Sequence, residues 1–209
     1  MELEFYLFNI DDITKLEQKT NQIIKREKGC NQYEINLAPS QNIADYAKTI
    51  AQTRQNIIDS AIALGGSADF SSKPFTNDYG NSMHIHLNFI DHDDIEKYAQ
   101  ILCHYLPDTL KYFLPTPEDY KRLDHHFMAP THICYGGNNR TVAIRIPDSH
   151  PKRLEHRLAA ASADETLVLY TILQSIAKGL AEPSSIEPTQ KIHGNAWDAQ
   201  YGLVKILPD

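Results

Sequence analysis

The order of strand-like and helix-like segments constrains the fold more than any other feature of this 209-residue chain. Apolar residues at every second position predict strands, and apolar residues three or four positions apart predict helices. In chain order the segments read strand, helix, strand, helix, strand, strand, helix, strand, strand, helix. That order lacks the regular strand–helix alternation of a doubly wound parallel sheet. It predicts an α+β fold in which helices back a mostly antiparallel sheet.

Six segments are expected to be strands, and the third and fourth flank a turn at residues 77–80. They are residues 2–8, 32–38, 68–75, 82–89, 141–147 and 153–158.

Four segments are expected to be helices, and a polar residue is expected at the start of the first three. They are residues 11–25 capped by Asp11 or Asp12, a long helix capped by Ser40 and ended by Gly65-Gly66, a helix from Asp93 or Asp94 to about Tyr112, and residues 163–180. Pro107 is expected to bend or split the third helix. Residues 115–137 are expected to form a loop and residues 181–209 an irregular tail, within a single domain that spans residues 1–209.

Composition excludes several classes of protein. The 20 Lys+Arg against 27 Asp+Glu give a net charge of −7, which disfavours a nucleic-acid binder. No run of about 18 apolar residues predicts a membrane span. The acidic start differs from a secretory or transit peptide. Three widely spaced cysteines indicate reduced thiols in the cytoplasm.

Charged residues recur at every second position of three predicted strands, and such residues share one face of a strand. Glu34 lies on a further strand, and Glu27 precedes it in a turn. The three rows are Glu2 with Glu4, His84 with His86, and Arg153 with Glu155 and Arg157.

Four carboxylates that face one another repel unless a cation lies among them. Mg²⁺ and Mn²⁺ prefer such oxygen ligands. Arginines suit phosphate or carboxylate groups, and the two sets together suit metal-assisted phosphoryl transfer. Solvated strand faces and surface ion pairs are the alternative interpretation of each row. Most of the other histidines, among them His92, His104, His125, His126 and His193, are expected to be structural or exposed.

Taken in order, six motifs resemble the catalytic domain of the glutamine synthetase family. That resemblance implies a curved sheet. The motifs are ELEFYLF at 2–8, Glu27 with QYEINL at 32–37, KPF at 73–75 with Gly80 and MHIH at 83–86, YKRL at 120–123 with Ala129-Pro130, Asn139-Arg140 with RIP at 145–147, and RLEHR at 153–157.

The resemblance implies two or more divalent cations, Mg²⁺ or Mn²⁺, with ATP as co-substrate. Catalytic roles would fall to Arg145 and Arg140. The implied metal ligands are Glu4, Glu27 and Glu34 for one ion and Glu2, His84 and Glu155 for another; His86, Arg140, Arg153 and Lys152 would contact the nucleotide phosphates; Arg122, Arg157 and Gly80 would bind glutamate.

The sequence also departs from the family pattern. The family's N-terminal β-grasp domain and part of its C-terminal region have no counterpart. Met128 aligns with the flap Glu that accepts the ammonium proton. Tyr79 aligns with an Asn beside the glutamate site, and residues 164–166 replace the NPY segment near the base.

Two functions remain open at this point. The first is a ligase that joins glutamate, or a similar carboxylate, to ammonia or, preferably, an amine through a γ-glutamyl phosphate. The second is a catalytically impaired relative that binds nucleotide or metal, or serves as a regulatory or complementing subunit. Small molecules are the expected partners, without nucleic acid or membrane. A homo-oligomer smaller than the family's stacked rings, such as a dimer, is expected.

Overall fold

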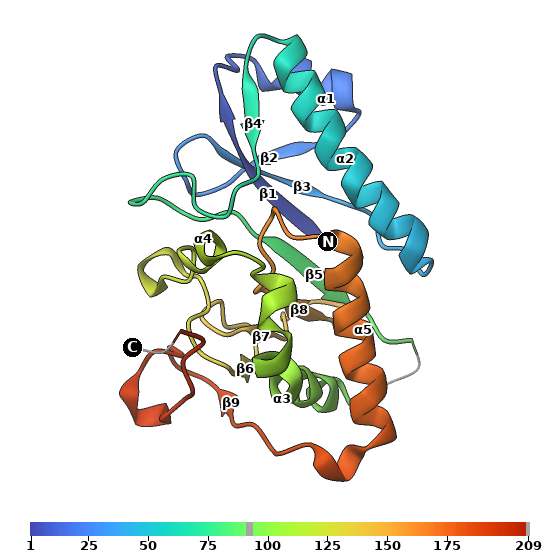
Figure 1. The fold of residues 1–209 in the computed structure, drawn as a ribbon, viewed down its shortest axis with the longest axis vertical. Coiled ribbons are helices and arrows are strands. Elements are labelled where there is room, and N and C mark those ends of the chain that lie inside the picture. The colour runs from blue at the N-terminus through green and yellow to red at the C-terminus, as the bar shows by residue number, and fades with distance from the viewer. Residues whose placement is uncertain (91–93, 208–209) are drawn as a thin grey trace.

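A computed structural model of the chain describes residues 1–90 and 94–207. Within those residues one nine-stranded sheet has the order β2-β3-β1-β5-β8-β7-β6-β9, with β4 paired to β1 (Figure 1). The strands are β1 Glu2–Phe8, β2 Ile24–Arg26, β3 Gln32–Asn36, β4 Ser67–Asp69, β5 Met83–Leu87, β6 Tyr135–Gly136, β7 Ile144–Arg145, β8 Leu154–His156 and β9 Lys191–Ile192.

Helix α5 lies between α2 and α3 and packs against both (Figure 1). Arg54 of α2 holds α5 through an ion pair with Glu165 at 2.9 Å. The helices are α1 Ile13–Thr20, α2 Ile43–Ala63, α3 Ile95–Phe113, α4 Pro117–Tyr120 and α5 Glu165–Ala181, and the short 3₁₀ helices are His125–Phe127, Pro183–Ser185 and Ala199–Tyr201.

The sheet is mostly antiparallel, which confirms the predicted α+β class. Strand β6 pairs in parallel with β7 and with β9, and the other pairings are antiparallel. The prediction of an irregular tail is wrong at β9, because Lys191–Ile192 joins the sheet beside β6. Two residues are too few for a period-2 pattern to be visible in the sequence.

Strand β1 divides the molecule into a core side and a polar side. Leu3 and Phe5 are fully buried and belong to the main hydrophobic core. Helices α2, α3 and α5 supply the other half of that core with residues such as Ile57, Leu102 and Ile172. Because side chains alternate along a strand, Glu2 and Glu4 are directed to the opposite face.

Four helices begin at an Asp or Asn whose side chain accepts a backbone N–H, and two of these caps, Asp12 and Asp94, are among the residues that the sequence suggested. The four N-caps are Asp12, Asn42, Asp94 and Asp164. The predicted cap Ser40 is wrong, because Asn42 accepts from Asp45 N at 3.2 Å and Ser40 instead accepts from Asn42 N at 3.1 Å. Asp93, the alternative start of α3, lies outside the described residues.

The predicted helix 11–25 is too long. Helix α1 ends at Thr20, and Asn21 adopts the left-handed conformation with φ of 53°. The chain then returns as β2, whose Ile24 lies opposite Ile35 of β3. The apolar residues at 23 and 24 continued the helical spacing by coincidence, and pairing with β3 decided their structure.

The strands predicted at 68–75 and 82–89 do not form a hairpin with each other. Both pair with β1, at different places along it. Tyr6 lies opposite Asp69 of β4, and Glu2 lies opposite His84 of β5. Strand β1 has seven residues, so it is long enough to pair with the short strands β4 and β5 one after the other along its length.

Two further predictions need correction. Helix α3 runs unbroken past Pro107, so the proline does not split it. The predicted loop 115–137 contains α4, a 3₁₀ turn and β6. None of the helices within the described residues is both long and apolar enough to span a membrane.

The two glycines after α2 predict a contrast in stability. Gly65 has φ of +86° with open space around it, whereas a Cβ on Gly66 would collide with the carbonyl oxygen of Phe8. Gly66→Ala should lower the free energy of unfolding by about 1–3 kcal/mol through overpacking. Gly65→Ala should cost roughly 1–2 kcal/mol through backbone strain alone.

Asn substitutions separate the two causes in urea unfolding. Asn tolerates the left-handed conformation, so Gly65→Asn should be milder than Gly65→Ala. Gly66→Asn should be at least as damaging as Gly66→Ala. Equal effects of Asn and Ala at position 65 would contradict this explanation.

Candidate functional site

The register of the sheet brings the predicted acidic residues together. Glu4 of β1 lies directly opposite Glu34 of β3, and Glu2 lies opposite His84 of β5. Glu2 and Glu4 are two residues apart and share a face. The middle of the sheet therefore presents three carboxylates and an imidazole side by side.

The same row continues across the next strands. His86 of β5 lies opposite Glu155 of β8, and Glu155 lies opposite Arg145 of β7. The row thus crosses five neighbouring strands, from β3 to β7. Its members are separated by up to 153 positions in the chain, so only the completed sheet assembles them.

These residues line one cavity of about 190 Å³. The lining contains all six predicted metal ligands and four of the predicted anion-binding arginines. From these sets it includes Glu2, Glu4, Glu27, Glu34, His84, Glu155, Gly80, Arg122, Arg140, Arg145 and Arg157. His86, Arg153 and Lys152 are not among the lining residues.

Glu2 and Glu155 lie on either side of two imidazoles. His84 Nδ1 is 3.2 Å from Glu2 Oε2 and 3.5 Å from Glu155 Oε1. His86 Nε2 is 3.1 Å from Glu2 Oε1. Ligand atoms of Glu2, His86 and Glu155 all lie within 4.8 Å of one another. The donor set fits a divalent cation, with His86 beside the predicted ligand His84.

The second group of carboxylates consists of Glu4, Glu27 and Glu34. Glu4 Oε2 accepts hydrogen bonds from Ser82 N at 2.8 Å and Ser82 Oγ at 2.6 Å. Glu34 accepts one from Asn36 Nδ2 at 2.6 Å. Three carboxylates at one wall form the oxygen-rich set that Mg²⁺ or Mn²⁺ prefers.

Burial and repulsion between carboxylates raise the pKa values of two members of that second group, Glu34 and Glu27. Burial, followed by the charge of Glu2 and then those of Glu27 and Glu4, raises the pKa of Glu34 to about 7 despite the Asn36 hydrogen bond. Burial and the charge of Glu4 also raise the pKa of Glu27. A bound divalent cation would relieve both shifts, so these residues fit a metal.

Glu155 has the opposite environment. Burial by itself would raise its pKa, but the charges of Arg157, His84 and Arg145 outweigh burial and hold the pKa at about 2. Arg145 Nη1 donates to Glu155 Oε2 at 2.6 Å, and Arg157 donates to Oε1. Glu155 is therefore an ionised, almost fully buried carboxylate between two guanidinium groups.

The predicted arginines differ in how their guanidinium groups are engaged. Arg122 is 3% exposed and donates to the carbonyl oxygens of Asn81, Arg157 and Leu158. Burial lowers its pKa to about 10. Arg140 is exposed at the edge of the cavity. The glutamate-binding role of Arg122 stays a prediction, and its observed contacts fix the backbone on either side of the site.

Arg153 and Lys152 lie at the far end of the row. Arg153 Nε donates to His86 Nδ1 at 3.0 Å, and another guanidinium nitrogen donates to Ser149 Oγ. Arg153 thus orients the imidazole of His86, which faces Glu2. Lys152 is exposed and does not line the cavity.

Sequence reasoning missed three polar residues of the cavity lining, which are Lys28, Gln32 and Ser82, and part of one wall. The Ser82 hydroxyl bridges Glu4 and His84, with 2.8 Å between Ser82 Oγ and His84 Nε2. The period-2 rule could have found it, since Ser82, His84 and His86 share a face. Tyr79, Phe127 and Met128 form a largely apolar side of the cavity. Phe127 contacts the ring of Tyr79, with 5.4 Å between centroids.

The family description "Glutamine synthetase, catalytic domain" matches residues 10–206. The chain is 27% identical to the gamma-glutamylputrescine synthetase PuuA of Escherichia coli over 213 residues. The matched region covers 94% of this chain and 44% of PuuA. It is 30% identical to the glutamate–methylamine ligase of Methyloversatilis universalis over 71% of this chain and 39% of that relative. The chain thus spans less than half the length of these relatives.

A solved structure, the GmaS/ADP complex, has the same fold. It superposes with a TM-score of 0.81 at 22% identity, over 99% of this chain and 60% of the GmaS chain. The likeness confirms the expected architecture.

The raised pKa of Glu34 predicts how stability depends on pH and metal. Between pH 4.5 and about 7 the native Glu34 keeps a proton that the unfolded chain has released. The contribution of Glu34 to the free energy of unfolding therefore falls as the pH rises through that range. Because Mg²⁺ competes with that proton, the rise in Tm caused by Mg²⁺ should grow over the same range.

Glu34→Gln provides the matched control in a thermal-shift series. The variant should show a smaller Mg²⁺-induced rise in Tm and a weaker dependence of that rise on pH. A wild-type response to Mg²⁺ and Mn²⁺ that is zero, or that declines from pH 5 to pH 8, would contradict the metal assignment.

Proposed function

Because the chain belongs to the glutamine synthetase catalytic-domain family, we propose that it is an ATP- and divalent-metal-dependent ligase that joins the γ-carboxylate of glutamate, or of a similar acid, to an amine. One observation carries the proposal: the six predicted metal ligands and four of the predicted anion-binding arginines line one cavity. Carboxylates that need a cation and arginines that suit anions are the two halves of a phosphoryl-transfer site.

In the proposed reaction the γ-phosphoryl group of ATP moves to the carboxylate, and the amine then displaces phosphate. The products are an amide, ADP and phosphate. Bound Mg²⁺ or Mn²⁺ would offset charge on the phosphates, held by Glu4, Glu27 and Glu34 and by Glu2, His84 and Glu155. Arg140 and Arg153 would bind phosphate groups. Arg145, which lies 2.6 Å from Glu155, would stabilise the group in transfer.

An amine is the favoured nucleophile because of the wall that faces the site. Met128 occupies the position where the family carries the Glu that takes the ammonium proton, and because a thioether accepts no proton, ammonia and amines alike would have to arrive as the free base. Tyr79 and Phe127 extend the apolar surface beside it. An alkyl group can pack against this wall, and the names of two relatives specify putrescine and methylamine as their amines.

A specific observation also favours the alternative of a catalytically impaired relative that binds nucleotide or metal. Arg145 and Arg157 both pair with Glu155, and three of the five N–H groups of Arg122 donate to carbonyl oxygens. The arginines that are predicted to bind substrate thus already form ion pairs or hydrogen bonds with other groups of this chain. A regulatory or complementing subunit of a homo- or hetero-oligomer would retain such a pocket.

A cytoplasmic location remains part of the proposal. The three cysteines are free thiols, with Cys103 and Cys134 buried and Cys30 exposed. Reduced thiols are typical of cytoplasmic proteins.

Release of ADP by the purified protein tests the proposal. ATP, Mg²⁺ or Mn²⁺ and glutamate would be supplied with ammonium, methylamine, putrescine or no amine. We expect release that requires both glutamate and one amine. Absence of release with every acid and amine, in a sample whose Tm still rises with Mg²⁺ and ATP, would reject the ligase in favour of the binding protein.

Met128 predicts the choice of nucleophile. Met128→Glu should raise the ratio of ammonium-dependent to amine-dependent ADP release at least tenfold, because the carboxylate would deprotonate ammonium and would interrupt the apolar wall against which the alkyl group of an amine packs. Met128→Leu, the matched apolar control, should leave the ratio unchanged. Equal ratios in the Glu and Leu variants would exclude this role for position 128.

Arg140 offers a clean test of the anion site. It is exposed, so Arg140→Ala should leave Tm within the range of ordinary surface substitutions. If Arg140 binds phosphate, the same variant should reduce kcat/KM for ATP by roughly 10²-fold. Arg122→Ala should instead lower Tm, because its buried guanidinium bonds three carbonyl groups. Unchanged kcat/KM in Arg140→Ala would remove Arg140 from the site.

A further inference from the structure

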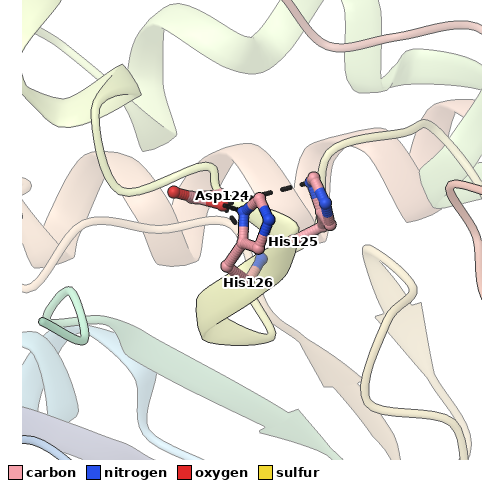
Figure 2. Close-up of side chains that lie close together, drawn as sticks. All are labelled: Asp124, His125 and His126. Atoms are coloured by element: carbon pink, nitrogen blue, oxygen red, sulfur yellow. Dashed lines mark hydrogen bonds and ion pairs between the residues drawn. The ribbon is translucent and has the colours of Figure 1, made fainter. Parts of the chain in front are cut away.

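A second group of metal-binding side chains lies outside the carboxylate row. Asp124, His125 and His126 offer ligand atoms that all lie within 4.8 Å of one another (Figure 2). Both histidines are exposed, and Asp124 is half-buried. The residues are consecutive, at the start of the 3₁₀ helix that leads to the apolar wall of the cavity.

The local backbone holds these three side chains together. Asp124 caps the 3₁₀ helix, and its Oδ1 accepts from His126 N at 2.9 Å. The same oxygen lies 2.9 Å from His126 Nδ1 and 4.0 Å from His125 Nδ1. The two imidazole rings face each other with 3.9 Å between centroids. The carboxylate and both rings are therefore gathered by a single turn.

The cap alone does not account for this arrangement. A capping Asp explains the position of the His126 backbone, and a hydrogen bond explains one imidazole. His125 is held separately, between the ring of His126 and the indole of Trp197, whose centroid is 5.3 Å away. The described hydrogen bonds of the Asp124 side chain use Oδ1, so Oδ2 remains a ligand atom for an ion.

The donor chemistry selects a class of metal. Two imidazole nitrogens and one carboxylate suit Zn²⁺, Ni²⁺ or Cu²⁺, whereas Mg²⁺ prefers oxygen. Around a tetrahedral ion with bonds of about 2.0–2.1 Å, neighbouring ligand atoms lie roughly 3.3 Å apart. The distances of 2.9 and 4.0 Å from Asp124 Oδ1 to the two imidazole Nδ1 atoms bracket that value, and rotation of the carboxylate about its Cβ–Cγ bond brings Oδ2 to the same place. Small side-chain rotations would complete the set and leave outer positions open to water.

We propose that Asp124, His125 and His126 form a binding site for a Zn²⁺-class transition metal, distinct from the carboxylate-rich centre. The ion sits on the segment that carries Phe127 and Met128 into the cavity. Lys73 Nζ lies 3.8 Å from the Phe127 centroid, and Arg157 donates to Met128 O at 3.4 Å. Occupancy would brace this segment, so the metal is placed to influence the cavity without entering it.

The single tryptophan of the chain provides the readout. Cu²⁺ would be titrated into the untagged protein with Mg²⁺ in excess, while Trp197 fluorescence is recorded. We expect saturable quenching with one equivalent of Cu²⁺ that is insensitive to further Mg²⁺ and is reversed only by a large excess of Zn²⁺, because Cu²⁺ binds such ligands more tightly than Zn²⁺ does. Quenching that Mg²⁺ reverses, or no quenching at all, would overturn the proposal.

Substitutions assign the signal to these residues. His125→Gln and His126→Gln should each weaken Cu²⁺ binding at least tenfold, and Asp124→Asn should weaken it while keeping an N-cap. His104→Gln, on α3, is the matched control and should bind as the wild type does. Tm values near the wild type would show that the variants are folded. Undiminished binding in both His125→Gln and His126→Gln would place the ion elsewhere and reject the site.

Discussion

Repulsion between carboxylates on adjacent strands is the constraint on which the site depends. Glu4 and Glu34 lie directly opposite each other in an antiparallel pair, an arrangement that costs stability. The sheet tolerates it because Ser82 and Asn36 bond these carboxylates, and because the hydrophobic core on the other face fixes the register of β1. A shift of one residue would place the glutamates in the hydrophobic core and turn Leu3 and Phe5 to the polar face of the sheet.

Much of this architecture could be predicted from local patterns in the sequence. The alternation at Glu2–Phe8 and the caps at Asp12 and Asp94 are encoded by neighbouring residues, and the structure has them at those positions. Strands of two or three residues, such as β9, carry no such pattern. The partners of β4 and β5 were also beyond local reasoning, because pairing depends on the free edges of β1.

The site divides in the same way. Residue types and period-2 spacing indicated which side chains share a face, and the family motifs placed them in one pocket. Neither could reveal that Arg145 and Arg157 both bond Glu155, since β7 and β8 must first pair. Nor could they show that Arg122 is enclosed by carbonyl groups, which depends on backbone segments distant in the chain.

The position of Glu155 between two arginines has a thermodynamic consequence. As long as the guanidinium groups neutralise this carboxylate, neither charge is fully available to a ligand. A cation that binds Glu155 frees Arg145 and Arg157 to attract an anion, and an anion that draws those arginines away leaves Glu155 ready for a cation. If the proposed cation and anion both bind here, their binding would therefore be linked with positive cooperativity, and by reciprocity each would raise the affinity for the other by the same factor.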